Sequence, residues 1–313
     1  MQPKLIIHGG AGSSLEDKGG LAIVRQSLDR VINEVYELLV GGTSAIDAVI
    51  RGCQLLEDDP LFNAGTGSVL QSDGQIRMSA GLMDGKAQRF SGIINISRVK
   101  NPIDLASKLQ DGFDRVLSDT GATELARELQ VHLFDPIVDK RLQEWFQERQ
   151  GNFHREMADV VAAPGAERLR DPYEDDEAGR GTIGVVALDR EGRLAAGTST
   201  GGKGFERIGR VSDSAMPAGN YATANAAVSC TGIGEDIIDE CLAAKIVVRV
   251  TDGLSLKEAF DRSFTECNRH QRDLGAIAID ASGAMAWGKT SDLILAAYHN
   301  GDRIGDSLEA GKG

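Results

Sequence analysis

The sequence of 313 residues lacks the features of membrane-spanning and disulfide-stabilised proteins. It contains no run of about 18 apolar residues, the least that a membrane helix needs, and the N-terminal MQPKLIIHGG holds too short an apolar run for a secretion signal. The four cysteines form no C-x-x-C pair, a pattern typical of buried free thiols in a reducing compartment. We therefore expect a cytoplasmic protein without a membrane partner.

Positive charge is also scarce. The chain has 34 Lys and Arg residues against 47 Asp and Glu residues, which gives a net charge of −13. Nucleic-acid surfaces need clustered Lys and Arg, so we expect no nucleic-acid partner. The histidines have no H-x-x-x-H or comparable spacing, so we expect no catalytic metal or cofactor. Surface or packing roles are expected for His8, His132, His154, His270 and His299.

Three familiar motifs are incomplete or lack their context. Residues 197–204, GTSTGGKG, satisfy G-x-x-x-x-G-K, but Gly204 stands where a phosphate loop needs Ser or Thr, and no helical period follows. No G-x-S-x-G elbow is present for a serine nucleophile. Asn95-Ile96-Ser97 matches a glycosylation sequon, but no secretion signal accompanies it. These patterns disfavour nucleotide binding and serine-triad chemistry.

Glycine, by contrast, is abundant, and the chain alternates between helical and strand patterns. The 38 glycines have no G-X-Y period, so they indicate tight turns and close backbone approaches. Helical spacing of apolar residues predicts helices over 20–39, from the N-cap Thr43 to Leu56, over 101–149 with breaks, and over 234–250 and 255–268. Strand patterns predict hairpins that turn at 72–74, 190–192 and 281–283, and another strand over 90–99. Antiparallel hairpins with flanking helices favour an α+β fold.

Residues 151–181 differ from their surroundings. Low hydrophobicity and the acidic block DPYEDDE at 171–177 predict a flexible, solvated linker. It ends at Gly181, and the strand pattern TIGVVALD begins at Thr182. A cut between these two residues would leave Thr182 with a free α-amine beside its hydroxyl, so one residue would carry both nucleophile and base. Gly-Thr also commonly begins a strand without any catalytic role.

Two further groups of residues strengthen the catalytic interpretation. The partner strand of the predicted hairpin ends in Thr198-Ser199-Thr200, so its hydroxyls return beside Thr182. Arg210 and Asp213 lie three residues apart in a glycine-rich loop. They suit the carboxylate and the ammonium of an α-amino acid, although a plain surface ion pair would explain them as well.

Together these segments resemble the plant-type asparaginase and isoaspartyl aminopeptidase group of N-terminal-nucleophile (Ntn) hydrolases. The matching segments keep the family order: HGGAG (8–12), PLFNAGTGSV (60–69), MDG (83–85), KNP (100–102), GTIGVVALD (181–189), GTSTGG (197–202), GRVSDS (209–214) and SCTGIGE (229–235). Residues 131–180 and the segment WGKTSDLILAAYHNGDRI near the C-terminus do not match position by position. The resemblance implies a single Ntn-hydrolase domain over 1–313, built as a four-layer αββα sandwich of mainly antiparallel sheets.

The resemblance also implies self-cleavage between Gly181 and Thr182. The products would be an α chain of residues 1–181, ending in a flexible tail from about 151, and a β chain of residues 182–313. A dimer of αβ heterodimers is implied as well. The family roles fall on Thr182 (nucleophile), Thr200 (helper hydroxyl), Thr231 and Gly232 (oxyanion hole), Arg210 (substrate carboxylate), Asp213 (substrate ammonium), Gly234 (substrate pocket) and Asn63 (beside the scissile bond).

The segment after the second predicted helix resembles the family loop that holds a structural sodium ion through backbone carbonyls. The matching positions are Leu56, Glu57, Asp59, Phe62, Ala64 and Thr66. Asp59 stands where the family usually has cysteine, and Thr66 where it usually has isoleucine. No other cofactor is implied.

The implied reaction is hydrolysis of β-aspartyl (isoaspartyl) peptides and L-asparagine, with release of L-aspartate. Three alternatives remain: an N4-(β-N-acetylglucosaminyl)-L-asparagine hydrolase of the same fold, a threonine endopeptidase, and a non-enzymatic ligand-binding protein that retains the fold. The loops GGKGFERIG (201–209) and SAMPAGNYA (214–222) differ from those of the better-known members. Because they flank the expected pocket, the preferred leaving group, ammonia or a peptide amine, stays open.

Overall fold

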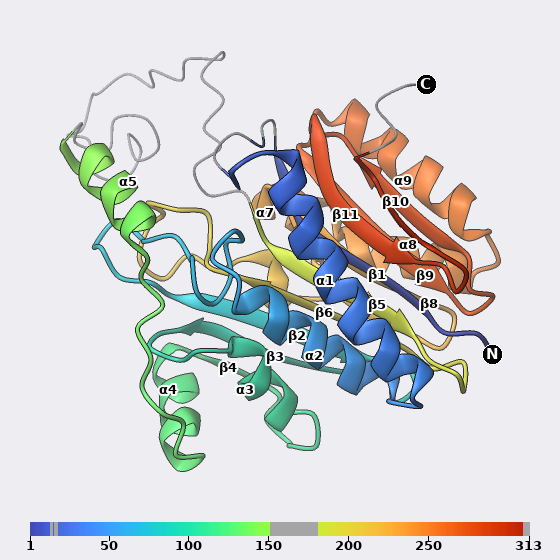
Figure 1. The fold of residues 1–313 in the computed structure, drawn as a ribbon, viewed down its shortest axis with the longest axis horizontal. Helices are drawn as coiled ribbons and strands as arrows, with labels where there is room; N and C mark the ends of the chain where they lie inside the picture. Colours follow the sequence, from blue (N-terminus) through green and yellow to red (C-terminus); the bar gives the residue numbers. More distant parts are fainter. Residues whose placement is uncertain (13–14, 16–17, 151–180, 309–313) are drawn as a thin grey trace.

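The computed structural model describes residues 1–12, 15, 18–150 and 181–308 (Figure 1). Most of the predicted linker, residues 151–180, lies outside this part of the chain. The described residues form two sheets, one of eight strands and one of four. None of their helices has the length and apolarity that a membrane span requires.

The larger sheet has the strand order β12-β11-β1-β5-β6-β2-β3-β4. Its neighbouring strands pair antiparallel, except for the parallel pair β3 and β4. The strands are β1 (Lys4–Gly12), β2 (Met78–Asp84), β3 (Arg89–Ile96), β4 (Val116–Ser118), β5 (Ile183–Leu188), β6 (Leu194–Thr200), β11 (Leu293–His299) and β12 (Ile304–Asp306). Every residue of β5 and β6 is buried, as expected for central strands that are covered on both faces.

The smaller sheet has the order β10-β9-β8-β7, and all its pairs are antiparallel. Its strands are β7 (Asn220–Ala222), β8 (Ala226–Gly232), β9 (Leu274–Asp280) and β10 (Met285–Lys289). It packs against the larger sheet through an apolar cluster that joins Ile6 and Val186 to Ile277 and Ile279. The α+β class with mainly antiparallel sheets is therefore confirmed.

Helices cover the other face of each sheet (Figure 1). Helices α1 (Leu21–Val40), α2 (Ala45–Glu57) and α3 (Pro102–Lys108) pack on the larger sheet. Alternation along β1 decides which side chain goes where: Leu5 and Ile7 enter the core under these helices, whereas Ile6 faces the smaller sheet. The smaller sheet is covered by α7 (Gly234–Glu240), α8 (Leu242–Thr251) and α9 (Leu256–Arg269). The remaining helices are α4 (Asp119–Glu128), α5 (Asp139–Gln150) and the 3₁₀ turn η2 (Asp213–Ala215).

Several details of the predicted secondary structure are wrong. The N-cap of α2 is Ser44 rather than Thr43, because the Ser44 side chain accepts a hydrogen bond from the Asp47 backbone. The expected hairpin around 72–74 is only a tight turn, closed by a hydrogen bond from Gln71 N to Gln75 O, and β2 starts after it. The helix expected over 234–250 is two helices, because Cys241 adopts a left-handed backbone with φ 47°. The stretch after α3 also contains the short strand β4.

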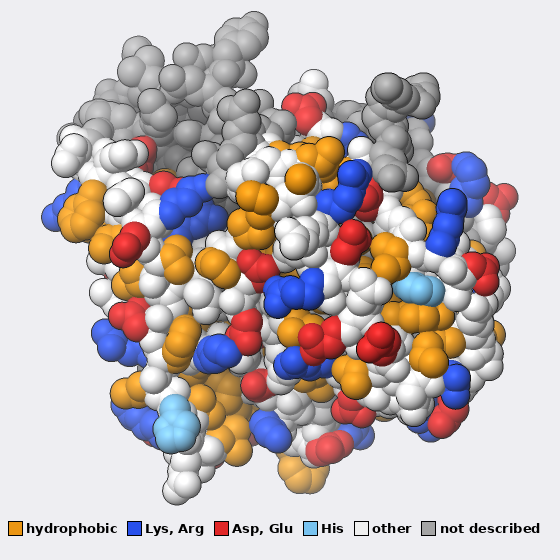
Figure 2. All heavy atoms as spheres, viewed as in Figure 1, with side chains coloured by type: hydrophobic (Ala, Val, Ile, Leu, Met, Phe, Trp, Pro, Cys, Tyr) orange, Lys and Arg blue, Asp and Glu red, His pale blue; other side chains and the backbone are white. Residues whose placement is uncertain are grey.

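Charged side chains on the outer face of α1 and α2 form ion pairs. Arg51 on α2 pairs with Glu34 on α1 at 2.6 Å, and Arg25 pairs with Asp306 of β12 at 2.6 Å. Figure 2 shows basic and acidic side chains interspersed on this face rather than gathered by sign. The outer face of these helices is therefore a solvated surface.

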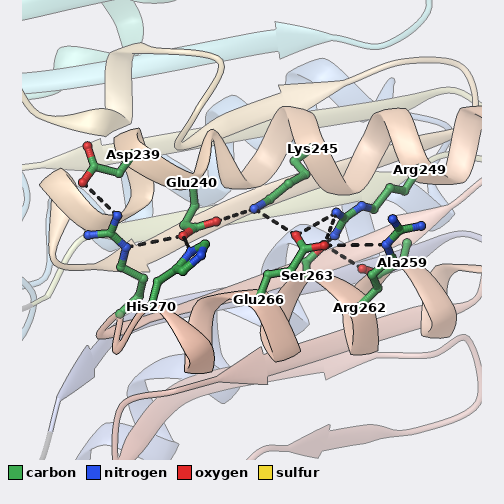
Figure 3. A network of polar contacts seen from close by, with 10 residues as sticks. Asp239, Glu240, Lys245, Arg249, Ala259, Arg262, Ser263, Glu266 and His270 are labelled. Atoms are coloured by element: carbon green, nitrogen blue, oxygen red, sulfur yellow. Dashed lines mark hydrogen bonds and ion pairs between the residues drawn. The ribbon is translucent and has the colours of Figure 1, made fainter.

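A denser ionic network joins α7, α8 and α9 (Figure 3). Glu240, at the end of α7, accepts hydrogen bonds from Lys245 of α8 and Arg272, and its carboxylate lies 2.5 Å from His270 Nδ1. Arg249 of α8 donates two 2.7 Å hydrogen bonds to Glu266 of α9. The network therefore anchors one end of α7, whose other end begins at Gly234 in the predicted substrate pocket.

Candidate active site

The predicted nucleophile and the helper threonine lie side by side. Thr182 directly precedes β5, and Thr200 is the last residue of β6, the antiparallel partner of β5. Thr182 Oγ1 donates a hydrogen bond to Thr200 Oγ1 at 3.1 Å, and Thr200 Oγ1 also accepts one from Gly202 N at 3.1 Å. The two threonines are 8% and 2% exposed. The hairpin thus brings the two hydroxyls together as its sequence predicts.

The peptide bond before Thr182 is held by Asn63. The Asn63 backbone N–H donates to Gly181 O at 3.2 Å, and its side-chain Nδ2 donates to Gly202 O at 2.7 Å. The segment HGGAG reaches the same bond: a Cβ on Gly10, whose φ is +120°, would lie 2.6 Å from Gly181 Cα. An N–H directed at a carbonyl oxygen stabilises the negative charge that develops there when a nucleophile attacks.

Arg210 and Asp213 converge on Gly234. A Cβ on Gly234 would lie 2.5 Å from Arg210 Nη2 and 2.8 Å from Asp213 Oδ1, so only glycine leaves space between the two charges. Asp213 Oδ2 is buried and has no hydrogen-bond partner among the described residues. Burial raises the pKa of Asp213 to about 7, although the Arg210 charge opposes the shift. Asp213 is therefore buried beside Gly234, whereas the ion pair of Arg210 is with the more exposed Glu235.

Thr231 and Gly232 form the end of β8. Thr231 is fully buried, and its hydroxyl has no hydrogen-bond partner within the described part of the chain. Two residues earlier, Ser229 Oγ lies 2.6 Å from Thr198 Oγ1 of β6. Because side chains alternate along a strand, Thr231 faces the larger sheet as Ser229 does. Gly232 has φ +120°, and a Cβ there would lie 2.5 Å from Leu274 Cα.

Comparison with known proteins shows which family the chain belongs to. The sequence model of a family described as asparaginase matches residues 1–309. The chain belongs to the asparaginase family. It is 68% identical over 313 residues to an isoaspartyl peptidase/L-asparaginase of Nostoc sp., covering 100% of this chain and 96% of the relative. A protein of the same name from Synechocystis sp. is 63% identical, covering 99% and 91%. A plant-type L-asparaginase of Pyrococcus horikoshii is 33% identical, covering 94% and 95%. The resemblance inferred from the sequence is confirmed.

A buried polar chain lies beside β5 of this asparaginase-family protein. His8 Nε2 lies 3.0 Å from Ser229 Oγ, which in turn contacts Thr198. A Cβ on Gly184 would collide with both Ser229 Oγ and His8 Nε2, so glycine makes room for the contact. Burial lowers the pKa of His8 to about 3, so its imidazole is neutral. A packing role was expected for His8, but its link to Ser229 could not be read from the sequence.

Arg210 has partners that the sequence did not reveal. Its Nε and Nη2 donate to the Glu235 carboxylate, both at 3.0 Å, and Glu235 lies within the matching segment SCTGIGE. The Arg210 carbonyl accepts a 3.1 Å hydrogen bond from Asn95 Nδ2. Asn95 has a left-handed backbone, with φ 56°, next to an irregularity in the β2–β3 register. Its neighbour in the ladder, Ser79, accepts the Asn95 N–H at 3.1 Å.

The predicted sodium loop offers neutral oxygen donors. The carbonyls of Glu57 and Asp59 accept hydrogen bonds from Thr66 N at 2.7 Å and Phe62 N at 3.2 Å, and each carbonyl retains a second lone pair. The Asp59 carboxylate is engaged by Ser27, and by Arg30 at 3.1 Å. In the described residues, no cluster of three or more His, Cys, Asp or Glu side chains could hold a metal. These backbone carbonyls are the ligands that the predicted sodium ion would use, and the ion itself stays a prediction.

Proposed function

We propose that this protein is an autoprocessed threonine amidohydrolase that cleaves β-aspartyl peptides and L-asparagine and releases L-aspartate. The observation that carries the proposal is the hydrogen bond between the hydroxyls of Thr182 and Thr200, because Thr182 directly follows Gly181. The names of the relatives from Nostoc and Synechocystis, isoaspartyl peptidase/L-asparaginase, support the substrate class. The proposed architecture is a single Ntn-hydrolase domain in four αββα layers.

Self-cleavage would generate the active enzyme. The Thr182 hydroxyl attacks the carbonyl carbon of Gly181, the peptide C–N bond breaks, and the acyl group moves from nitrogen to oxygen. The N–H of Asn63 on Gly181 O supports the charge that develops during the attack. Water then hydrolyses the ester. The products are an α chain of residues 1–181, ending in a carboxylate, and a β chain of residues 182–313, beginning with a free amine.

Hydrolysis of the substrate would repeat the same chemistry. The free α-amine of Thr182, with an intrinsic pKa of about 7.7–8.0, takes the proton from its own hydroxyl. The alkoxide attacks the substrate β-carbonyl, and Thr231 Oγ1 and Gly232 N–H stabilise the oxyanion, each contributing about 3–4 kcal/mol. The leaving amine departs with the proton, and water releases aspartate from the acyl-enzyme.

The α-amino-acid end of the substrate would lie at Gly234. Asp213, whose buried Oδ2 has no donor among the described residues, accepts the substrate ammonium. Arg210 binds the substrate carboxylate while it stays paired with Glu235. Gly234 leaves room for the α-carbon between the two charged residues. This set of groups suits a free α-amino acid.

We also propose a structural sodium ion at the backbone carbonyls of residues 56–66 and a dimer of αβ heterodimers. The ion would stabilise the loop that positions Asn63, without taking part in the reaction. Exchanging sodium chloride for choline chloride at equal ionic strength should lower the melting temperature. An unchanged melting temperature, and no gain on returning sodium, would contradict the sodium proposal.

Substrate assays test the proposed reaction. Purified protein is incubated with L-asparagine and with β-aspartyl-leucine, and L-aspartate release is measured. Release is expected from both substrates, weakly from Thr182→Ser and not at all from Thr182→Ala. A folded, cleaved protein that releases no aspartate from either substrate would favour a binding protein. Release from N4-(β-N-acetylglucosaminyl)-L-asparagine alone would favour the glycoamidase alternative.

A further inference from the structure

Three polar side chains that the proposed reaction does not use lie between the two sheets. His8, Thr198 and Ser229 are all fully buried. Ser229 Oγ lies 2.6 Å from Thr198 Oγ1 and 3.0 Å from His8 Nε2, and Thr198 Oγ1 also donates to Gly219 O at 3.5 Å. Next to them the facing sheets pack through an apolar cluster. Polar groups in such a layer cost free energy unless they are hydrogen-bonded, so their presence here needs an explanation.

The three side chains form a bridge across one row of the larger sheet. His8 of β1 pairs with Gly184 of β5, and Gly184 pairs with Thr198 of β6. Gly184 has no side chain, and the Ser229 hydroxyl enters the space above it from the smaller sheet: a Cβ on Gly184 would lie 2.0 Å from Ser229 Oγ. Ser229 therefore contacts the residues on both sides of Gly184 and joins β8 to β1 and β6.

The proposed catalytic groups lie one step further along the same strands. Thr198 is two residues before Thr200 on β6, and Ser229 is two residues before Thr231 on β8. Residues two apart on a strand share a face and are about 6–7 Å apart. Thr182, at the start of β5, is hydrogen-bonded to Thr200. The bridge therefore lies directly behind the proposed nucleophile pair on one sheet and the proposed oxyanion hole on the other.

Apolar packing alone would define the sliding of one sheet over the other only weakly. Burial of apolar surface is not directional, whereas a hydrogen bond weakens steeply when donor and acceptor move out of line. A catalytic group must be held within about 0.5 Å of its productive position, and a displacement of about 1 Å can lower a rate about 100-fold. A directional contact between β6 and β8 at this point therefore fixes the distance from the Thr231 hydroxyl to the nucleophile.

We propose that Ser229 and Thr198 are positioning residues that hold the proposed oxyanion hole over the nucleophile, with His8 completing the bridge. This inference rests on the proposed function. The bridge acts on the position of β8, because the hairpin of β5 and β6 is held by its own ladder of backbone hydrogen bonds. Loss of the bridge therefore moves the oxyanion hole and leaves the two catalytic threonines together.

The two reactions of the proposed function should respond differently to this loss. Substrate hydrolysis uses the oxyanion hole on β8, whereas self-cleavage uses the N–H of Asn63. Asn63 is held by residues outside the smaller sheet: its side chain donates to Gly202 O and accepts from Val69 N, and its carbonyl accepts from Gly201 N. Breaking the bridge therefore slows substrate turnover and spares self-cleavage.

The test compares two variants of Thr198 that differ in one hydroxyl. Thr198→Val keeps the branched shape and removes the hydroxyl, whereas Thr198→Ser keeps the hydroxyl. In Thr198→Val the kcat for L-asparagine should fall about 10- to 100-fold, since removing an oxyanion donor outright costs about 100- to 1,000-fold. Its KM should change less than about threefold, because Arg210 and Asp213 lie outside the bridge. Thr198→Ser should restore kcat to within about threefold of the wild type.

The rate of self-cleavage separates this role from a general loss of structure. Cleavage is followed on gels during cell-free synthesis of each protein, and Thr198→Val should cleave within about threefold of the wild-type rate. The matched control is Ser91→Ala. The Ser91 hydroxyl is also fully buried, donates to Ala106 O at 2.6 Å and accepts from Gln110 Nε2 at 2.8 Å. Its loss removes two hydrogen bonds from β3 and should leave kcat unchanged.

A second variant breaks the bridge from the smaller sheet. Ser229→Ala should show the same low kcat and the same intact self-cleavage, and combining it with Thr198→Val should lower kcat no further, because both remove one contact. Wild-type kcat in both folded single variants, or self-cleavage that slows as much as kcat, overturns the inference. Failure of the wild type to cleave itself or L-asparagine contradicts the proposed function instead.

Discussion

Asn95 should control substrate affinity through the backbone of Arg210. Its amide donates to the Arg210 carbonyl at 3.1 Å, and its φ of 56° is one that asparagine and glycine tolerate. Asn95→Asp keeps the size and the backbone preference but turns a carboxylate oxygen toward that carbonyl. The lost hydrogen bond is worth about 1 kcal/mol, and the uncompensated acceptor adds about 1–2 kcal/mol.

Part of the free energy lost in Asn95→Asp should be lost from substrate binding, because the loop that carries Arg210 shifts. A loss of about 1.4 kcal/mol in substrate binding corresponds to a tenfold increase in KM. We therefore expect Asn95→Asp to raise KM for L-asparagine about tenfold and to change kcat less than threefold, because Thr182 and Thr200 belong to the β5–β6 hairpin and Asn95 to β3. Steady-state kinetics on the cleaved enzyme measure both constants.

The matched control is Asn95→Gly, which suits the left-handed backbone and removes the donor without adding an acceptor. Its KM should rise about threefold, less than in Asn95→Asp. Urea unfolding of both variants shows whether the fold persists. Two folded variants with wild-type KM would refute the role of Asn95 in placing Arg210.

Three further predictions follow from buried groups. Burial raises the pKa of Asp213 to about 7, so its carboxylate, which pairs with the substrate ammonium, becomes protonated as the pH falls below about 7. Competitive inhibition by L-aspartate should therefore weaken in acid, and a Ki independent of pH from 5.5 to 8 would contradict this. Although burial opposes it, hydrogen bonds from Lys245, His270 and Arg272 lower the pKa of Glu240 to about 2 from an ordinary value of 4.5. This stabilisation is present above pH 4.5 and is lost as the pH falls toward 2. Glu240→Gln should therefore lower the free energy of unfolding by about 2 kcal/mol at pH 7, and the difference from the wild type should shrink in acid. Equal urea midpoints of the two proteins at pH 7 would contradict this. Gly184→Ala places a methyl group against Ser229 and His8 and should cost about 1–3 kcal/mol of stability, measured by thermal unfolding. The control is Gly192→Ala, where the site has open space but the backbone is strained at φ 76°.

The sequence predicts best where local pattern and active site coincide. The turn at 190–192 fixes the register of β5 and β6, and this register alone brings Thr182 beside Thr200. The spacing of Arg210 and Asp213 likewise places both charges at one end of a short loop. In these cases residues close in sequence are also close in space, so periodicity and turn chemistry suffice.

The contacts that the sequence did not predict join residues far apart in the chain. His8 meets Ser229 across the two facing sheets, and Asn95 reaches Arg210 from a bulged strand. Nothing in a local pattern specifies such partners. The apolar helical pattern over 234–250 likewise did not reveal the break at Cys241, whose left-handed backbone separates α7 from α8. Tertiary packing overrides local propensity there.

The central claim is that Thr182 becomes an N-terminal nucleophile by cleavage after Gly181. Intact mass under denaturing conditions, with N-terminal sequencing of each chain, tests it directly after incubation of the purified protein. The account predicts two chains, the second beginning Thr-Ile-Gly-Val, and a single uncleaved chain in Thr182→Ala. A wild-type chain that stays whole while it hydrolyses L-asparagine, or a new N-terminus at any residue other than Thr182, would contradict it.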